Sequence, residues 1–546
     1  MQPEAEKTRA ESLARGFLRG DVSRRAFLRR AGGFSALALG STSLGAVLAA
    51  CSKDDSGGTN PSGSPATGSI APGGTLKAAL TGEPDTLDPA TSTIYTGAQV
   101  YDNIFSKLID IDTDGSFVGI LATDWTAVDE KTWMFNLVDN ATFHNGEAFT
   151  ADDVKYTFER ILDPKTASSY APLYDPIRSV EVAGPTQVIF HLRTPFGPFL
   201  SNLANNGEIV NQKAIEAADP ARNPVGTGPF SFLEWVQGDH ITLEKFDGYF
   251  MQGKPYLDGI EFKFLLVDQG RIDGLNGREL DWVDAVPLQS LSSLSTDPAY
   301  TYVTSATAGI PDYLALNTVK APFDDKLVRQ AVYWAIDRTQ IRDVAYSGAG
   351  EVGIEEVPTG STWFDGASVV TPDPDKARSL LSQAGFADGL TVEYLGLPQY
   401  PELLKTGQVV REQLKQVGIT MNIKQVDVSI WFDAFVKGDY QITSAYQERT
   451  IDPDNFYSLV VRSGGVINTT GYSNPEADDL IDQARVETDE ATRSQLYTQI
   501  RQIVFDDSPI IYAHFETINY LMRPDVTGST VNATLELRMQ DVGFTQ

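Results

Sequence analysis

Side chains that could bind a polar solute gather between Tyr446 and Asp454. This segment reads Tyr-Gln-Glu-Arg-Thr-Ile-Asp-Pro-Asp and closes in a proline turn. Carboxylate and guanidinium groups form charge-assisted hydrogen bonds with ionised solutes, and a tyrosine ring offers an apolar surface. Asp452 and Asp454 flank Pro453, which is common turn chemistry. A structural turn and a working pair of acids, as glycosidases use, are the two interpretations of that pair.

Few residues in the chain suit catalysis or metal binding. None of the four histidines pairs with another at a metal-ligand spacing, at positions His144, His191, His240 and His514. The patterns HExxH, GxSxG and the P-loop are absent. The sequence Phe-His-Asn-Gly around His144 could indicate a catalytic histidine. A turn explains it more simply, because a lone histidine without an orienting partner is weak evidence for a catalytic base. The sequence predicts no enzyme, no cofactor and no metal.

Two of the seven tryptophans are candidates for a pocket. Trp363 and Trp431 lie near loop or helix-start signals, and core packing is the equal alternative for both. Trp125, Trp133 and Trp334 stand in apolar contexts and are predicted to be core residues.

Strands and helices alternate along the chain, which favours an α/β architecture. Thr150 precedes Asp153 by three residues, ahead of apolar residues at helical spacing, so a capped helix is predicted there. Residues 325–338 predict another helix. The first strand is expected over Thr75–Leu80, just after Gly73 and Gly74.

A strand–helix–strand unit is predicted over residues 390–423. Apolar residues alternate from Leu390, a helical pattern follows and ends at Gly418, and alternation resumes from Ile419. Two such strands are parallel, with a right-handed crossover. A further strand is expected over 440–445. Because ligands of open α/β sheets bind beyond the carboxyl ends of the strands, the segment after residue 445 lies at a candidate site.

The first 51 residues carry two processing signals. Ser23–Arg29 resembles a twin-arginine export signal, and Leu48–Cys51 resembles a lipoprotein cleavage box. The apolar stretch between them is short and rich in glycine for a membrane span, which is the alternative. We predict removal of residues 1–50, lipidation of Cys51 and attachment to the outer face of the cell membrane. Cys51 is the only cysteine, so no disulfide is expected.

The exported part is acidic and begins with a tether. Residues 1–50 hold 8 Lys and Arg and 4 Asp and Glu, so their removal leaves 35 and 69, a net charge of −34. Such a surface repels phosphate backbones, which argues against nucleic-acid binding. Residues 51–71 are rich in Ser, Gly, Pro and Thr, and predict a flexible tether.

Several stretches, in order along the chain, resemble the extracellular solute-binding proteins of peptide-type ABC importers, the dipeptide, oligopeptide and nickel family (family 5). The resemblance runs from about Gly73 to the C-terminus. It is carried by Thr81–Pro89, Tyr101–Phe105, Phe143–Gly146, Phe149–Val154, Gly226–Phe230, Pro322–Asp325, Val328–Ala331, Ala335–Arg338, Asp375–Arg378 and Gly471–Pro475.

The resemblance implies a two-lobed α/β fold of the periplasmic-binding-protein type (type II, with an extra subdomain) around a central ligand cleft. A discontinuous first lobe would combine residues 72–105, 210–304 and 516–546. Residues 106–209 would form the extra subdomain and residues 305–515 the second lobe. The family closes its lobes around a solute and delivers it to permease subunits in the membrane. A monomer is expected. A secreted hydrolase and a ligand sensor with the same cleft are the competing classes.

One residue departs from the family. Peptide-binding members place an aspartate three residues before the acid-proline turn, where it holds the peptide ammonium. Here that position is Arg449, whose guanidinium favours a carboxylate or phosphate. Pairing of Arg449 with nearby acids, or a one-residue shift that gives Glu448 the ammonium role, are the alternatives. The predicted ligand contacts are Tyr446, Glu448, Arg449, Asp452, Trp431, Trp363, Tyr95 and Asp284.

Overall fold

The computed structural model describes residues 69–92, 94–447 and 451–546. The predicted export signal, Cys51, the tether up to residue 68, Glu448 and Arg449 lie outside these residues. Within the described part, no helix is both long enough and apolar enough to cross a membrane.

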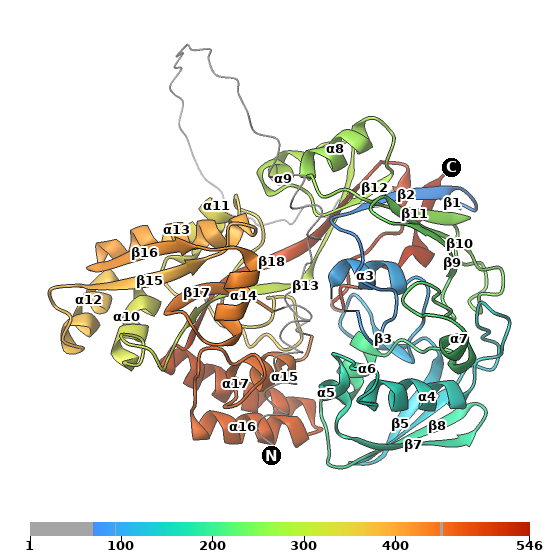
Figure 1. The fold of residues 1–546 in the computed structure, drawn as a ribbon, viewed down its shortest axis with the longest axis horizontal. Coiled ribbons are helices and arrows are strands. Elements are labelled where there is room, and N and C mark those ends of the chain that lie inside the picture. Colours follow the sequence, from blue (N-terminus) through green and yellow to red (C-terminus); the bar gives the residue numbers. More distant parts are fainter. Residues whose placement is uncertain (1–68, 93, 448–450) are drawn as a thin grey trace.

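One large mixed sheet runs through the molecule and joins its two halves (Figure 1). Two long antiparallel strands at its centre, β13 and β18, connect the halves and pair along most of their length. A short strand, β14 (Glu351–Val352), pairs with β18. The other strands follow one another in the order β16 (Ile419–Gln425), β15 (Leu390–Gly396), β17 (Ile442–Tyr446), β13 (Thr301–Leu316), β18 (Ile510–Met522), β12 (Trp282–Asp284), β2 (Thr75–Leu80), β11 (Gly259–Phe264), β10 (His240–Lys245) and β9 (Phe230–Val236).

The first half packs its strands on a core to which distant parts of the chain contribute. Leu76, Ile104, Phe262 and Met539 are all buried in that core. The helices of this half are α3 (Tyr95–Tyr101), α8 (Asp268–Asn276) and α9 (Leu288–Leu294).

The described chain starts and ends in one small sheet beside this half. β1 (Ile70–Ala71) and β19 (Val526–Thr527) both pair with β20 (Gly543–Thr545). The first strand is therefore β1 and not Thr75–Leu80, because Ile70 and Ala71 find partners at the far end of the chain.

A separate four-stranded antiparallel sheet lies beside the first half. Its core combines buried Phe135, Phe158 and Phe190 with residues of neighbouring helices. The predicted capped helix is confirmed as α4, in which the Thr150 amide donates to the Asp153 carboxylate at 2.9 Å. The elements here are β3 (Ile109–Ile111), β4 (Phe117–Gly119), β5 (Ala122–Asp129), β6 (Thr132–Leu137), α4 (Ala151–Leu162), α5 (Ala171–Tyr174), β7 (Ile177–Gly184), β8 (Gln187–Leu192), α6 (Phe199–Asn206) and α7 (Gln212–Ala217).

The second half contains the predicted strand–helix–strand unit. β15 and β16 pair in parallel, the helix between them packs on the sheet, and Gly418 takes the left-handed conformation just before β16. The predicted helix 325–338 is wrong in its extent. It ends at Ala335, and a second helix starts at Arg338 because the Asp337 carboxylate accepts a hydrogen bond from the amide of Gln340. The helices of this half are α10 (Lys326–Ala335), α11 (Arg338–Ala345), α12 (Pro374–Gln383), α13 (Pro401–Gln416), α14 (Val428–Val436), α15 (Pro453–Phe456), α16 (Pro475–Val486) and α17 (Glu490–Asp507).

Candidate ligand-binding site

In the first half, the carboxyl end of β12 points toward the second half. Trp282 pairs with Met522 and Asp284 with Tyr520, so β12 runs along β18 toward the region where β18 joins the other half. β2 runs parallel to β12 and therefore ends at the same edge.

In the second half, the carboxyl end of β17 points back toward the first. Ile442 pairs with Leu316 and Tyr446 with Asp312, so β17 runs along β13 in the opposite sense to β12. The partners of the two strand ends are six residues apart in β18, or about 20 Å at the rise of a strand. The edges at which α/β sheets bind ligands thus face each other across the connecting strands.

The structure brings two predicted contacts, Tyr95 and Asp284, together in the first half. The Tyr95 hydroxyl lies 3.3 Å from the hydroxyl of Tyr520, which is the strand partner of Asp284. Gln99 donates to the Asp284 carboxylate at 3.0 Å. Burial raises the pKa of Asp284 to about 6, because the charged form loses its water. This group can therefore exchange a proton near neutral pH.

In the second half, Tyr446 ends β17, and its ring centre lies 5.9 Å from that of Tyr400. Trp431, another predicted contact, belongs instead to the core. Its side chain is buried, its indole N–H donates to Thr443 at 2.9 Å, and its ring stacks on Phe435. Because Thr443 satisfies its polar atom and Phe435 covers its face, Trp431 is removed from the predicted ligand contacts.

Asp452 is fully buried and engaged within the protein. Its two carboxylate oxygens accept hydrogen bonds from Arg493 at 2.7 and 2.9 Å, and Ser201 donates to one of them at 3.3 Å. Asp452 also starts α15 by accepting from the amide of Asp454. The structural-turn interpretation of this pair of acids therefore holds, and the predicted direct contact of Asp452 with a ligand is corrected to the positioning of Arg493.

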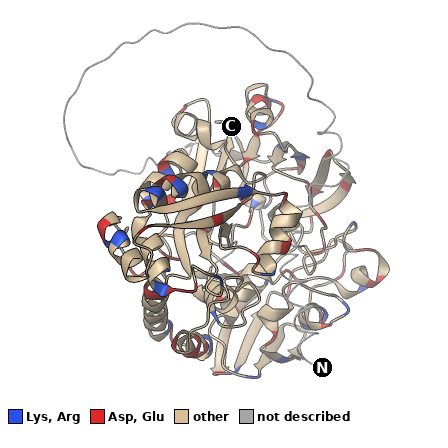
Figure 2. Cartoon of the chain, turned by 60° about the vertical axis from the view of Figure 1, so that its left-hand side comes forward, with Lys and Arg blue, Asp and Glu red and all other residues tan. Residues whose placement is uncertain are grey.

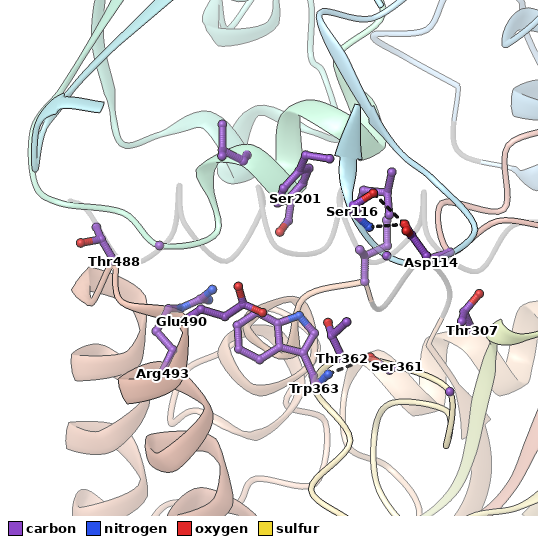
Figure 3. A pocket seen from close by; sticks show the side chains of 18 of the residues that line it. Asp114, Ser116, Ser201, Thr307, Ser361, Thr362, Trp363, Thr488, Glu490 and Arg493 are labelled. Carbon is purple, nitrogen blue, oxygen red and sulfur yellow. Dashed lines mark hydrogen bonds between the residues drawn. The ribbon is translucent and has the colours of Figure 1, made fainter. Parts of the chain in front are cut away.

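A cavity of about 430 Å³ lies beside this ion pair (Figure 3). The hairpin between β3 and β4, helix α6, strand β13, the loop 360–363 and the start of α17 all contribute to its wall. Trp363, a predicted pocket residue, lines it, and the guanidinium carbon of Arg493 lies 4.9 Å from the centre of the Trp363 ring. Trp133, predicted to be core, is half-buried and lines the same cavity.

Sequence reasoning missed Arg493 as a site residue. It lies 41 positions from Asp452, within the long helix α17, where the spacing of apolar residues indicates only that one face is buried. No local motif marks it, because its role depends on packing between α15 and α17.

His144 has a structural role. Its Nε2 atom lies 3.1 Å from the carbonyl oxygen of Gly228, and its ring packs edge-on against Phe246. Burial lowers the pKa of His144 to about 4, so the ring is neutral at physiological pH. In the described ranges, no three His, Cys, Asp or Glu side chains are grouped so that they could hold a metal ion.

Comparison with known proteins identifies relatives over most of the chain. Residues 116–468 match the family model of bacterial extracellular solute-binding proteins, family 5. A probable D,D-dipeptide-binding periplasmic protein of Escherichia coli K12 is 28% identical, over 83% of this chain and 91% of its own length. A glutathione-binding protein of Pectobacterium atrosepticum is 25% identical, over 84% and 92%.

Solved structures agree with these matches. The binding protein AgaA of A. tumefaciens R10, solved with agropinic acid, is 29% identical, with a TM-score of 0.73, over 87% of this chain and 99% of its own. The periplasmic binding protein DppA of Helicobacter pylori, solved with the peptide STSA, has a TM-score of 0.76 at 24% identity, over 87% of this chain and 99% of its own. These likenesses confirm the predicted two-lobed α/β fold.

Proposed function

The chain belongs to family 5 of the bacterial extracellular solute-binding proteins, and from this premise we propose that it captures a peptide or a peptide-like anionic compound by lobe closure and delivers it to an ABC permease. Binding of a solute outside the cytoplasm is the activity common to the family. Family membership alone gives neither the solute class, nor the closing movement, nor the absence of catalysis, and we propose these three in addition.

The facing carboxyl ends of β12 and β17 support this function best. Among the described strands of the central sheet, β13 and β18 alone bridge the two edges, so rotation about these strands would open or shut the space between them. We assign residues 72–105, 210–304 and 516–546 to one moving lobe and residues 305–515 to the other, with residues 106–209 as the extra subdomain. A ligand that contacts both edges favours the closed form by its differential affinity for the two forms.

Relatives and the predicted contact Arg449 support the solute class. Related proteins carry names for glutathione, a D,D-dipeptide and agropinic acid. Each is a small compound with at least one carboxylate, which a guanidinium grips by two parallel hydrogen bonds. We propose that Arg449 holds such a carboxylate. Arg449→Ala should then weaken binding at least tenfold and leave the fold intact, whereas Glu448→Gln should have little effect.

Thermal-shift screening of the purified protein against peptides, sugars and opines would test the proposal. A ligand at 100 times its dissociation constant should stabilise the protein by about 2.7 kcal/mol. Solution scattering with that ligand should show a smaller radius of gyration, because the lobes approach one another. A ligand that binds tightly without changing the radius would contradict lobe closure, and its chemical conversion by the protein would instead support a hydrolase.

A further inference from the structure

The extra subdomain touches the second lobe where the segment before and at the start of α6 meets the helices α16 and α17 (Figure 1). We propose that this segment, Phe196–Ser201, is a latch that docks on the second lobe and holds the closed form, in part even before a solute binds. The proposal rests on the proposed lobe closure and gives the extra subdomain a task in it. A solute would then supply only the remaining free energy of closure.

The backbone of the latch approaches the turn between α16 and α17 very closely. The amide of Gly197 donates to the carbonyl oxygen of Arg485, near the end of α16, at 2.9 Å. A Cβ atom on Gly197 would lie 2.3 Å from the carbonyl oxygen of Glu487 and 2.6 Å from Nε of Arg493, which is closer than Cβ atoms come in folded proteins. Glycine is therefore the residue that lets the two backbones meet here.

Two side chains of the latch extend the contact. The centre of the Phe196 ring lies 5.6 Å from the guanidinium carbon of Arg485. The Ser201 hydroxyl donates to the Asp452 carboxylate at 3.3 Å. From the second lobe, Ile451 packs against the core of the extra subdomain. The latch thus reaches the segment that carries predicted solute contacts.

On its other side, the extra subdomain is fixed firmly to the first half. The ammonium group of Lys107 lies 3.1 Å from the Glu536 carboxylate, and both side chains are at most 12% exposed. Arg538 donates to the carbonyl oxygen of Ile111 at 2.7 Å. Separating Lys107 from Glu536 would leave two buried charges unpaired. We therefore expect the subdomain to move with the first half, so that its contact with the second lobe is the one that opens.

The charged groups on the second-lobe side of the contact do not depend on the latch. Asp452 and Arg493 bond to each other at 2.7 and 2.9 Å. Arg493 also donates to the Tyr497 hydroxyl and the Ala484 carbonyl within the same lobe. When the lobes part, the latch loses hydrogen bonds from uncharged donors, one cation–π contact and apolar packing. The contact can therefore be made and broken without leaving a charge unpaired.

Pulsed electron paramagnetic resonance between two spin labels would test the proposal in the absence of a solute. Labels at Glu159→Cys of α4 and Thr498→Cys of α17 report the distance between the extra subdomain and the second lobe. Both positions are exposed. The labels are placed in a Cys51→Ser background, because Cys51 is the only native cysteine. We expect two distances, a short one for the closed form and a long one for the open form.

Matched variants would assign the short distance to the latch. Gly197→Ala should lower the closed-to-open ratio at least tenfold, because its methyl group does not fit in the closed contact. The φ angle of Gly197 lies outside the left-handed region, so alanine is accommodated once the contact is open. Ser201→Ala removes one hydrogen bond and should lower the ratio about 2- to 10-fold. Gly184→Ala, in the same subdomain, meets nothing within 4 Å and is the control, which should leave the ratio unchanged.

The outcomes distinguish the latch from the lobe closure on which it rests. An equal closed-to-open ratio in the unaltered protein, Gly197→Ala and Ser201→Ala would overturn the latch alone. So would an unaltered protein that shows only the long distance, although closure driven by a solute would then stand. A single short distance in every variant would mean that the lobes do not part, and would overturn both.

Discussion

At the scale of single residues, the pair Asp452–Arg493 holds the floor of the cavity in place. Both side chains are buried, at 0% and 4% exposure, so neither charge is solvated by bulk water. Such a pair is sustained only by good geometry, which the two short hydrogen bonds between the partners provide. Removing one partner leaves the other as an unpaired buried charge.

We therefore expect Asp452→Ala to lower the free energy of unfolding by about 3–5 kcal/mol. The exposed pair Arg462–Asp482 offers a matched control, and Asp482→Ala should cost less than about 1 kcal/mol. Urea denaturation of the two variants would measure the difference. A loss below about 1 kcal/mol for Asp452→Ala, combined with lost solute binding, would return Asp452 to the ligand contacts.

A second buried cluster places three carboxylates around one guanidinium. The carboxylates of Glu355, Glu356 and Asp365 lie 3.6, 2.6 and 3.6 Å from Arg501. Burial first, and then repulsion by Glu356, raise the pKa of Glu355 to about 8. Glu355 is therefore protonated at neutral pH. Glu355 and Asp365 flank the loop that carries Trp363 into the cavity, and the Asp365 amide donates to the Glu355 carboxyl group at 3.3 Å.

The cluster predicts a loss of stability in alkali. The folded-state pKa of Glu355 lies above its ordinary value of 4.5, so its contribution to stability is full below about pH 4.5 and is lost as the pH rises through 8. Glu355→Gln keeps an uncharged side chain and should flatten this decline between pH 5 and 9. Thermal denaturation across that range would measure it, with Glu393→Gln, at an exposed position of β15, as the control. An unchanged pH profile in Glu355→Gln would contradict the assignment.

At the scale of elements, the connecting strands contain an irregularity where a hinge is needed. Thr304 of β13 pairs with Asn519 and Gly309 with Thr517, so four residues of β13 stand opposite a single residue of β18. Such a bulge interrupts the ladder and allows the strand to bend. Thr307 in this bulge donates to the carbonyl of Thr113, so the hinge touches the β3–β4 hairpin.

A substitution at Gly309 would test how tightly the two strands pack at this hinge. A Cβ atom there would lie 2.4 Å from the carbonyl oxygen of Glu516 and 2.5 Å from the Phe515 ring. Gly309→Ala should therefore push the two strands apart and destabilise the protein by about 1–3 kcal/mol. Gly270→Ala in α8 meets nothing within 4 Å and should be neutral or slightly stabilising. Equal stability of the two variants by urea denaturation would show that the strands separate freely.

Local patterns predicted elements better than they predicted the site. The capping box of α4 and the β15–α13–β16 unit were foreseen because hydrophobic spacing and caps act within a few residues. Trp363 and Trp431 have similar neighbours in the sequence, and only the fold separates them, since Thr443 and Phe435 enclose Trp431. The cavity joins segments that lie far apart in the sequence, and no spacing within one segment could have revealed it.

At the scale of the whole molecule, the position of the chain start bears on attachment to the membrane. β1 pairs with β20, so the predicted tether would join the first half, beside the C-terminus. The second half would then be free to swing about the connecting strands. Figure 2 shows acidic residues spread over many elements of both halves rather than gathered on one. The net charge of −34 predicted for the exported form therefore gives no single docking face.

The predicted lipid attachment at Cys51 and the predicted export signal can be tested separately, because loss of lipidation and loss of export leave the protein in different places. Cys51→Ser should leave an exported but unlipidated protein, because the lipid is attached to the cysteine sulfur, which serine lacks. Replacing Arg24 and Arg25 by lysine keeps the charge of the signal but removes the paired guanidinium groups, so the precursor should stay in the cytoplasm. Cell fractionation with immunoblotting would separate the two results. Normal export of the double-lysine variant would contradict a twin-arginine route and favour the general secretory one, whereas membrane retention of Cys51→Ser would favour an uncleaved anchor.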